Sequence, residues 1–430
     1  MLRNAALTTL LARQSLQAAS SSVNNEDLDP LRLNADGTFQ ISIFSDLHFA
    51  QDASGSGPDQ DRASVKVMSD ILDFDPPDLV VLNGDLINGE DTYRENSTHY
   101  IDQIVAPMVD RNLTWATTYG NHDHNRNING EGILEREHMW PGARTSAMIN
   151  TTMSGVTNYY LPVYASNCTT VEDCTPELLL WFFDSRGGRY YQGGAQPNWV
   201  HSDVVEWFED TNAALVEEYD TEIPSLAFVH IPIHATYVFQ QEEGPDKNYQ
   251  PGINQESVVQ QGDGWCAEGD DSGNCSYGDQ DDPFMRALVA TERIIGLFYG
   301  HDHGNSWCYN WNSRISDMTI TGNGINLCYG QHTGYGGYGD WIRGARQIIV
   351  TREGLRNNTV DSYIRLESGE SVGRVSLNST FNTDYYNSTS NQKTYLSDIF
   401  SAGSLIQPKV FSFYSSPLIL SLATVMCLSM

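Results

Sequence analysis

F-Q-I-S-I-F-S-D-L-H, residues 39–48, is an apolar run that ends in the polar motif D-L-H. Two more apolar runs end in the same way, with L-N-G-D-L at residues 82–86 and Y-G-N-H-D at residues 119–123. Each run is short and rich in β-branched or aromatic residues, and a helix-length segment separates it from the next, which predicts a parallel β-α-β series. Loops that leave neighbouring strands of an open α/β sheet converge at one edge, so we expect the three motifs to form a site there.

Two later motifs continue the same chemistry, with F-V-H-I-P at residues 228–232 and Y-G-H-D-H at residues 299–303. Each again closes an apolar run, so we expect both at strand ends. Together the five motifs supply three carboxylates, one amide and five imidazoles, from Asp46, Asp85, Asp123, Asn121, His48, His122, His230, His301 and His303. Mixed nitrogen and oxygen ligands of this kind suit Fe, Zn or Mn rather than calcium.

Charge and reach divide these side chains between two metal ions. In the step D-x-H, residues i and i+2 face the same side, so one ion is expected to bind both Asp46 and His48. A carboxylate has two oxygens, so Asp85 is expected to bridge the two ions. The predicted sets are Asp46, His48, Asp85 and His303 for the first ion, and Asp85, Asn121, His230 and His301 for the second.

Two divalent or trivalent cations about 3.5–4 Å apart suit the hydrolysis of a phosphate ester, because they clamp the attacking and leaving oxygens. His122, next to the predicted ligand Asn121, is expected to protonate the leaving oxygen or stabilise its charge. Asp123 is expected to orient the His122 ring. His332, in the glycine-rich stretch 330–340, is a further candidate for substrate contact, with an ordinary loop histidine as the alternative.

The chain has 430 residues, of which 40% are apolar, so it can bury a large core in one big enzyme domain or two ordinary ones. Its 24 basic and 55 acidic residues give a net charge of −31. Such a charge repels polyanions, so we expect no nucleic-acid partner. The expected partner is a phosphorylated substrate.

The remaining periodicity predicts helices and strands around the motifs. Helices are expected at residues 61–74, 93–112 with a break near Pro107, 131–139, 198–219 and 284–291. Strands are expected at residues 158–164, 178–184, 225–230 and 294–299, with several short ones within 314–364. Residues 240–283 are acidic and lack periodicity, so we predict a solvated insert near the substrate entrance.

Six of the seven cysteines fall into three neighbouring couples, for which we predict the disulfides Cys168–Cys174, Cys266–Cys275 and Cys308–Cys328. Six cysteines permit many other pairings, and reduced cysteines are the alternative. Eight N-x-S/T sequons accompany them, at Asn96, Asn112, Asn150, Asn167, Asn274, Asn357, Asn378 and Asn387. Both features favour a secretory route, and we expect a secreted or cell-surface glycoprotein, with a vacuole or another secretory lumen as the alternative.

The two ends of the chain carry weaker signals. Residues 1–22 are interpreted as a signal peptide, although Arg13 interrupts the apolar patch and the lack of acidic residues also fits a transit peptide. Residues 368–404 are rich in Ser, Thr and Asn, which predicts a glycosylated linker. The apolar tail at residues 405–430 follows small residues and matches a GPI-anchor signal, with a plain C-terminal membrane anchor as the alternative.

The order of D-x-H, G-D, G-N-H-D, a histidine before I-P, and G-H-D-H resembles the calcineurin-like metallophosphoesterase superfamily. The stretch L-C-Y-G-Q-H-T-G-Y-G-G-Y-G, residues 327–339, is similar to small plant proteins named as purple acid phosphatases and to their fungal relatives, a likeness that covers roughly residues 38–350. The resemblance implies an α/β fold, with a two-sheet β-sandwich flanked by helices, and a catalytic domain at residues 38–367. Purple enzymes carry a tyrosine that binds ferric iron where this chain has Asn88. The likeness therefore does not imply a purple chromophore or an obligatory ferric ion.

These features predict a phosphoric ester hydrolase that cleaves phosphate monoesters with a hydroxide activated by two metal ions. One alternative is a phosphodiesterase of the same superfamily. The other is a catalytically silent surface protein that retains the fold, which the predicted linker and tail would also suit.

Overall fold

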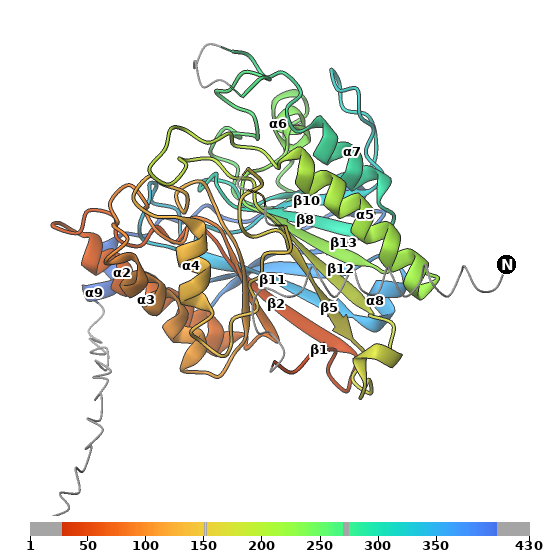
Figure 1. Cartoon of the computed structure of the whole chain (residues 1–430), viewed down its shortest axis with the longest axis horizontal. Coiled ribbons are helices and arrows are strands. Elements are labelled where there is room, and N and C mark those ends of the chain that lie inside the picture. The colour runs from red at the N-terminus through yellow and green to blue at the C-terminus, as the bar shows by residue number, and fades with distance from the viewer. Residues whose placement is uncertain (1–27, 150, 152, 270–274, 402–430) are drawn as a thin grey trace, which may run out of the picture.

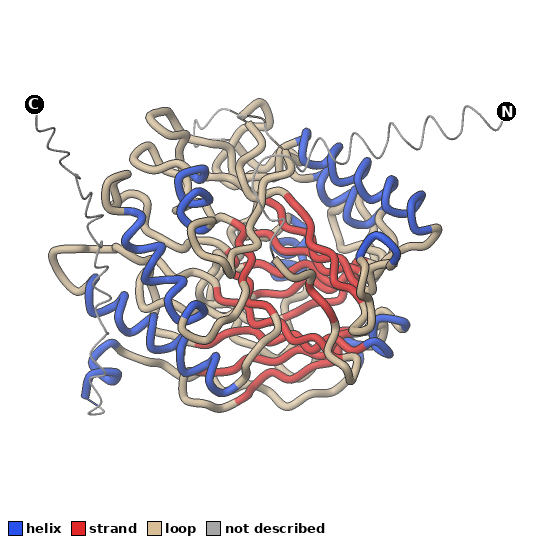
Figure 2. The backbone as a smooth tube through the Cα atoms, turned by 60° about the horizontal axis from the view of Figure 1, so that its bottom comes forward, coloured by secondary structure: helices blue, strands red, loops and turns tan. Residues whose placement is uncertain are grey.

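The computed structural model describes residues 28–149, 151, 153–269 and 275–401. Two β-sheets face each other at its centre, and helices cover both outer faces (Figure 1, Figure 2). This is the predicted α/β fold with a two-sheet β-sandwich. The predicted signal peptide at residues 1–22 and the apolar tail at 405–430 lie outside the described residues.

The six-stranded sheet carries the first three motifs. Its strand order is β13 (Ser371–Leu377), β12 (Val360–Leu366), β11 (Gly344–Thr351), β2 (Thr38–Phe44), β3 (Leu79–Asn83) and β4 (Trp115–Thr118). The strands β2, β3 and β4 run parallel, which confirms the predicted β-α-β series. Every residue of β3 and β4 is buried, as expected for parallel strands that are covered on both faces.

The seven-stranded sheet carries the two later motifs. Its order is β1 (Leu31–Arg32), β5 (Tyr159–Tyr164), β6 (Leu178–Phe183), β7 (Ser225–Val229), β8 (Ile294–Tyr299), β10 (Ile325–Tyr329) and β9 (Cys308–Trp311). The strands β5 and β6, at the positions predicted, are antiparallel. From β6 through β7 and β8 to β10 the strands run parallel, so their carboxyl ends share one edge.

Three apolar layers join the sheets and helices. Between the sheets, Ile41 and Val81 belong to the same buried cluster as Phe182 and Phe298. Successive side chains of a strand point to opposite faces, so Val80 packs instead under the helices on the outer face. The helices of that face are α2 (Gly57–Phe74), α3 (Ser97–Val109) and α4 (Gly130–Glu137), and those of the other outer face are α5 (Ser202–Tyr219), α6 (His234–Glu242) and α7 (Asp282–Ala290).

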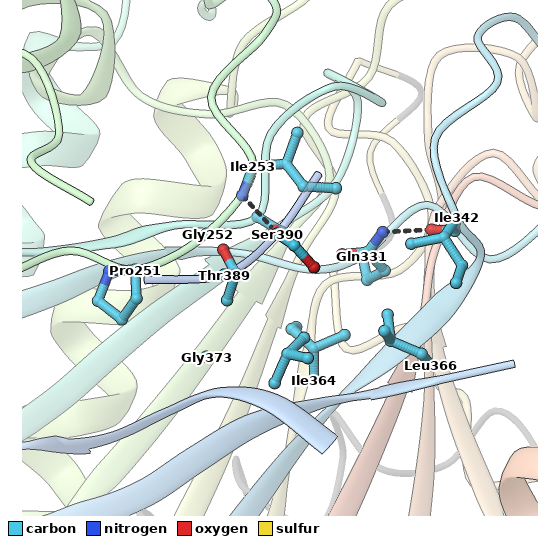
Figure 3. A pocket seen from close by; sticks show the side chains of 12 residues that line it. Pro251, Gly252, Ile253, Gln331, Ile342, Ile364, Leu366, Gly373, Thr389 and Ser390 are labelled. Carbon is cyan, nitrogen blue, oxygen red and sulfur yellow. Dashed lines mark hydrogen bonds between the residues drawn. The ribbon is translucent and has the colours of Figure 1, made fainter. Parts of the chain in front are cut away.

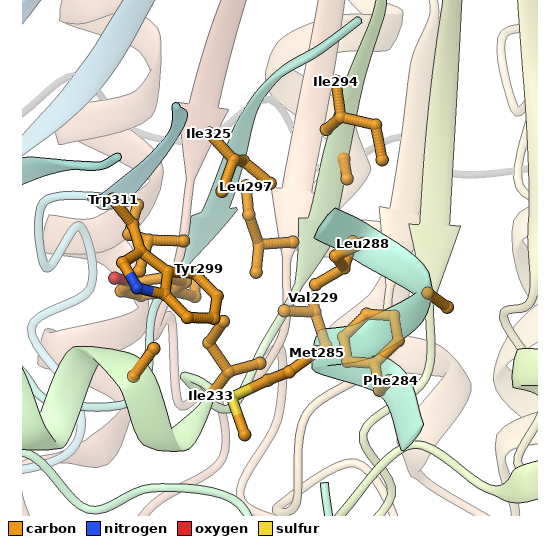
Figure 4. Close-up of a cluster of buried hydrophobic side chains, with 14 of the residues drawn as sticks. Val229, Ile233, Phe284, Met285, Leu288, Ile294, Leu297, Tyr299, Trp311 and Ile325 are labelled. Atoms are coloured by element: carbon orange, nitrogen blue, oxygen red, sulfur yellow. The ribbon is translucent and has the colours of Figure 1, made fainter. Parts of the chain in front are cut away.

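Helix α7 is fixed to the seven-stranded sheet by its apolar face (Figure 4). Phe284, Met285 and Leu288 belong to the same buried cluster as Val229 of β7 and Leu297 of β8. Replacing one large buried side chain of such a cluster with alanine typically costs about 2–5 kcal/mol. This packing holds in place the two strands that lead into the later motifs.

Helix boundaries differ from the predictions where the ends carry their own signals. α2 begins at Gly57 rather than at Asp61, because Pro58 fits the first turn of a helix. α3 is shorter than predicted and contains Pro107 in its last turn, so the proline marks the approaching end and does not break the helix. The short elements α8 (Arg352–Arg356), α9 (Leu396–Ser401), η1 (Val171–Asp173) and η2 (Phe381–Thr383) complete the described chain.

The prediction of a linker at residues 368–404 is wrong for its described part. Strand β13 pairs with β12, and its Leu377 is buried between the sheets together with Phe381. Farther along, the backbone N–H of Tyr386 donates to the Asn248 carbonyl at 2.7 Å. The polar composition that suggested a linker belongs to the outward face of an edge strand and to the segment that packs beside it.

Figure 3 shows a crevice where this C-terminal segment lies against the rest of the molecule. Thr389 and Ser390 line it together with Ile253, Gln331 and Ile364. Its volume of about 10 Å³ is enough for about one water molecule. The crevice is therefore a packing seam and not a binding site.

All three predicted disulfides are present: Cys168–Cys174, Cys266–Cys275 and Cys308–Cys328. The last of these joins β9 to β10 where the two residues face each other across the ladder. Between α6 and α7 the described residues form no helix or strand, in agreement with the predicted insert. Across the described ranges, no helix has both the length and the apolar character needed to cross a membrane.

Candidate metal centre

The five motifs meet at one edge of the two sheets. Phe44 pairs with Leu82, and Asn83 pairs with Thr118, so β2, β3 and β4 end side by side. β7 and β8 also end together in the other sheet. Each predicted ligand lies on the loop that directly follows one of these strands, which is the edge where open α/β sheets build their sites.

The loops at this edge bend through backbone conformations that most residues avoid. Asp46, Asp85 and His301 have φ angles of 59°, 52° and 76°, in the left-handed region. Gly84 cannot be replaced without a shift, because a Cβ there would lie 2.2 Å from His230 Nδ1. Strained backbone of this kind is concentrated at functional sites.

Two clusters of candidate ligands lie side by side. The first contains Asp46, His48 and His303, and the second contains Asp85, His230 and His301. A third group, His48, Asp85 and His122, overlaps both, and the ligand atoms of each group lie within 4.8 Å of one another. Asp85 faces both clusters, because its Oδ2 lies 3.6 Å from His48 Nε2 and 3.1 Å from His230 Nε2. The fold thus brings six of the seven predicted ligands together, with Asp85 between the first two clusters, and Asn121 follows β4 at the same edge.

Hydrogen bonds aim the imidazoles at the clusters. The ring Nδ1 atoms are engaged by Asn88 Oδ1 for His48 (3.3 Å), by the Asn83 carbonyl for His230 (2.9 Å) and by the Tyr338 carbonyl for His303 (3.0 Å). Each bond leaves the ring Nε2 free to face the cluster. Asn121 Oδ1 is buried and has no hydrogen-bond partner among the described residues, which fits an atom whose partner is a metal ion.

Burial favours the neutral, metal-binding form of His48 and His301, whereas Asp85 raises the pKa of His230 to about 10 against the effect of burial. Burial lowers the pKa of His48 to about 4 and that of His301 to about 3. Burial alone would raise the pKa of Asp85, but the neighbouring His230 outweighs it and lowers that pKa, so the carboxylate is charged. Neutral nitrogens beside carboxylates form a donor set that fits two metal ions.

His122 lies beside both clusters. Its backbone N–H donates to Asp85 Oδ1 at 2.8 Å, and its ring Nδ1 lies 2.8 Å from a carboxylate oxygen of Glu90. Burial by itself would lower the pKa of the imidazole, but Asp85 and Glu90 raise it to about 9. The His122 ring therefore holds a proton at neutral pH.

The prediction that Asp123 orients His122 is wrong. Asp123 is fully buried, and its carboxylate accepts hydrogen bonds from the backbone N–H groups of Leu86 (2.9 Å), Ile87 (3.1 Å) and Gly120 (2.9 Å). These bonds hold together the loops that follow β3 and β4. Side chains of adjacent residues on a turn point in different directions, so the residue next to His122 in sequence is not the one beside its ring.

The prediction that His332 contacts substrate is also wrong. Its side chain is 2% exposed, and its ring centroid lies 3.9 Å from that of His303, behind the first cluster. A backbone bridge to Ser45 fixes it there, and it does not line the cavity at the centre. The glycine-rich sequence around His332 gave no sign of this burial.

The cavity at the centre has a volume of about 330 Å³. Besides candidate ligands and His122, it is lined by Gln51, Asn88, Val259, Asp302, Gly337 and Tyr338. Val259 belongs to the insert, so part of the insert lies at the cavity, in agreement with the prediction. Glu90, Val259 and Tyr338 were missed because loop residues without metal-ligand spacing carry no pattern that marks them.

The sequence matches a known protein family and several named proteins. Residues 39–305 match the family model described as calcineurin-like phosphoesterase. The protein named "Probable inactive purple acid phosphatase 29" from Arabidopsis thaliana is 28% identical over 347 residues, which cover 74% of this chain and 78% of that protein. "Phosphatase DCR2" from Saccharomyces cerevisiae is 26% identical over 313 residues, which cover 69% of this chain and 48% of that protein.

Among solved structures, a dimetal phosphatase from Danio rerio is similar with a TM-score of 0.47 and 11% sequence identity, over 81% of this chain and 99% of that chain. The family model spans more than half of the chain and includes all five motifs. The chain therefore belongs to the calcineurin-like phosphoesterase family.

Proposed function

We propose that this protein hydrolyses phosphate monoesters with the help of two bound metal ions. The proposal rests on one observation: the two ligand clusters that meet at Asp85 open, together with His122, onto a single cavity. The first ion is assigned to Asp46, His48, Asp85 and His303, and the second to Asp85, Asn121, His230 and His301. When bound, the ions would offset the negative charge of the phosphoryl group and activate water for attack.

His122 is proposed to supply the proton for the leaving group. Its Nδ1 is engaged by Glu90, so the proton on Nε2 is the one that remains for donation. The ring lines the cavity, and its backbone bond to Asp85 keeps it beside the phosphoryl group. Donation of this proton to the leaving oxygen would release a neutral alcohol.

The name of one relative supports this proposal, and the name of another supports the alternative of a catalytically silent protein. The yeast relative is named a phosphatase, whereas the Arabidopsis relative is named a probable inactive one. A catalytically silent protein would have no need for an intact ligand set. Here every candidate ligand position carries a residue able to bind a metal, which supports an active enzyme.

The test is elemental analysis of protein purified without added metals, joined to a panel of phosphate monoesters and diesters over a range of pH. We expect roughly two equivalents of Fe, Zn or Mn and faster turnover of the monoesters. The His122→Ala variant should lose about 10²–10⁴-fold in kcat, and His99→Ala, which changes an exposed histidine, is the matched control. Failure of the metal-loaded protein to cleave any ester would support the silent alternative, and faster turnover of diesters would support a phosphodiesterase.

We also propose that the protein is a glycoprotein of the secretory pathway, attached to a membrane through residues 405–430. Its three disulfides are consistent with an oxidising compartment. Five sequon asparagines are exposed in the described chain: Asn96, Asn112, Asn167, Asn357 and Asn387. A lower apparent mass after N-glycosidase treatment would support glycosylation, and release of the protein from cells by a GPI-specific phospholipase would support the anchor.

A further inference from the structure

Tyr338 and Val259 form an apolar wall of the cavity that the proposed reaction does not use. Both line the cavity, and their side chains are 50% and 38% exposed. Tyr338 lies in the glycine-rich loop and Val259 in the insert, so the wall joins segments that are far apart in sequence. We call these two residues the Tyr338–Val259 wall.

Tyr338 is held at three points. Its ring stacks on the His303 ring, with the centroids 4.0 Å apart and 11° between the planes. Its carbonyl accepts a hydrogen bond from His303 Nδ1 at 3.0 Å, and its hydroxyl donates to the Glu256 carboxylate. One face of the ring is covered by His303 while half of the side chain stays exposed, which leaves a flat aromatic surface for a ligand.

Val259 is fixed from the other side of the wall. Its backbone N–H donates to Asp302 Oδ1 at 3.1 Å, and Asp302 Oδ2 accepts from the Tyr329 hydroxyl at 2.5 Å. In the same segment, Glu256 accepts a hydrogen bond from the Gly304 N–H at 2.7 Å. The wall is therefore in place before a ligand arrives, which lowers the entropy cost of binding.

Beyond the metal centre, the only cationic side chain among the described residues that line the cavity is His122, and it is already paired with Glu90. None of the described residues that line the cavity is Lys or Arg. Asp302 lines the cavity, but burial raises its pKa and both of its carboxylate oxygens already accept hydrogen bonds. Glu90 and Glu256 lie behind His122 and Tyr338, with which they form hydrogen bonds. A second anionic group on a substrate would therefore meet no unpaired cation among the described lining residues.

We propose that the Tyr338–Val259 wall binds the alcohol part of the substrate and selects phosphate monoesters whose alcohol part is a flat, uncharged ring. Esters with a second anionic group, such as a carboxylate or another phosphate, are rejected. The inference rests on the proposed function, because it concerns the substrate of the same site.

Two aryl esters, phenyl phosphate and 4-carboxyphenyl phosphate, test whether the site rejects a second anionic group. The assay uses the metal-loaded full-length protein. The leaving groups of the two esters have similar acidity, so the esters differ mainly in the added negative charge. We expect the carboxylated ester to have a kcat/KM lower by about tenfold or more, mostly through KM, which corresponds to the loss of one strong interaction. Equal kcat/KM values for the two esters would overturn the proposal.

A variant that gains affinity for the carboxylated ester distinguishes a binding role of the Tyr338–Val259 wall from general damage to the fold. The Val259→Lys variant places a cation in the wall at an exposed position and should lower KM for 4-carboxyphenyl phosphate relative to phenyl phosphate. Val259→Met has a long, uncharged side chain and is the matched control, for which the preference against the carboxylate should remain. Equal behaviour of the two variants would overturn the assigned position of the alcohol part.

The aromatic surface is tested at Tyr338. The Tyr338→Leu variant should raise KM for phenyl phosphate by about 3–10-fold, from the loss of ring stacking. Tyr338→Phe keeps the ring and should lie closer to the wild-type KM than the leucine variant does. Tyr385→Leu changes a tyrosine that is 72% exposed and outside the cavity, and it is the control for unspecific effects.

Phosphonates distinguish failure of this inference from failure of the proposed function. Phenylphosphonate and 4-carboxyphenylphosphonate are not hydrolysed, so their binding can be measured by calorimetry whether or not the protein is catalytic. Preference for phenylphosphonate that Val259→Lys reverses would support the wall even if no ester is cleaved. Equal binding of the two phosphonates, or no binding of either at millimolar concentration, would overturn it even if esters are cleaved.

Discussion

The His122 ring has one hydrogen-bond partner among the described side chains, the half-exposed carboxylate of Glu90, and it also contacts the His48 ring edge-on. A half-exposed partner still fixes the direction of the ring, because the distance between Nδ1 and the carboxylate oxygen is 2.8 Å. The residue that positions the acid thus comes from the loop after β3 and not from the GNHD motif itself.

The Glu90→Gln variant should lose about 10–100-fold in kcat with little change in KM, because it removes the charge that holds the protonated His122. The loss should be larger for alkyl phosphates than for nitrophenyl phosphate, since a poor leaving group depends more on the donated proton. Steady-state kinetics with both ester types measure the difference. An equal loss for both would show that Glu90 acts on something other than proton donation.

Asp281, near the end of the insert, is a buried carboxylate with no cationic partner among the described side chains. Its Oδ2 accepts a hydrogen bond from the His234 N–H at 2.7 Å, and its Oδ1 accepts from the Tyr277 hydroxyl. Burial raises the pKa of Asp281 to about 7, although these bonds lower it. The folded protein therefore binds a proton here more tightly than the unfolded chain does.

Because the folded pKa of Asp281 is the higher one, its favourable contribution is complete below the unfolded pKa, near 4, and is lost as pH rises towards 7. The Asp281→Asn variant is neutral at every pH. Its free energy of unfolding should therefore increase relative to wild type by roughly 2–4 kcal/mol between pH 4 and pH 8. Denaturant titrations at several pH values measure this difference in the free energy of unfolding. The Asp282→Asn variant, which changes the partly exposed neighbour, is the control. A constant difference between Asp281→Asn and wild type would contradict the pKa assignment.

At the scale of elements, the edge strand β13 closes the core between the two sheets. Val375 and Leu377 point inwards with 3% and 0% exposure, and Phe381 continues the same buried cluster. The strand is polar on its outer face, as edge strands that resist aggregation are.

A chain that stops at residue 367 should not fold to a stable protein, because it would lose these core side chains and expose the edge of β12. In the full-length protein, Leu377→Ala should cost about 2–5 kcal/mol, and Ser376→Ala, at the neighbouring outward position, should cost less than about 1 kcal/mol. Chemical denaturation measures both. A folded, active protein ending at residue 367 would restore the linker interpretation.

At the scale of the whole molecule, the metal centre joins the two sheets. Asp46, His48, Asp85 and Asn121 follow strands of the six-stranded sheet, whereas His230, His301 and His303 follow strands of the seven-stranded sheet. A ligand that binds only the folded state adds to its stability. Metal ions held from both sheets should therefore stabilise the complete fold and not one loop.

Removal of metal with a chelator should lower the Tm of the protein by about 3–8 °C, and the loss should reverse when Zn, Mn or Fe is restored. The Asp85→Ala variant should not respond to restored metal, because it lacks the carboxylate between the clusters. His99→Ala should respond like wild type. Differential scanning calorimetry combined with elemental analysis checks this. If the chelator removed the metal and the Tm did not change, the metal ions would not stabilise the fold.

The sequence by itself determined the β-α-β series and the order of the five motifs at strand ends. It also predicted two sets of candidate ligands and the three disulfides, although other cysteine pairings stayed open. These features depend on local patterns, since apolar runs, turn residues and cysteine spacing act within short stretches of chain.

Only the tertiary structure decided that Glu90 and not Asp123 holds His122, that His332 is buried behind His303, and that residues 371–377 form an edge strand. Each of these outcomes depends on where a loop side chain points or on which distant strand offers free backbone groups. Such contacts are set by packing between segments far apart in sequence, and their direction leaves no periodic trace in the sequence itself.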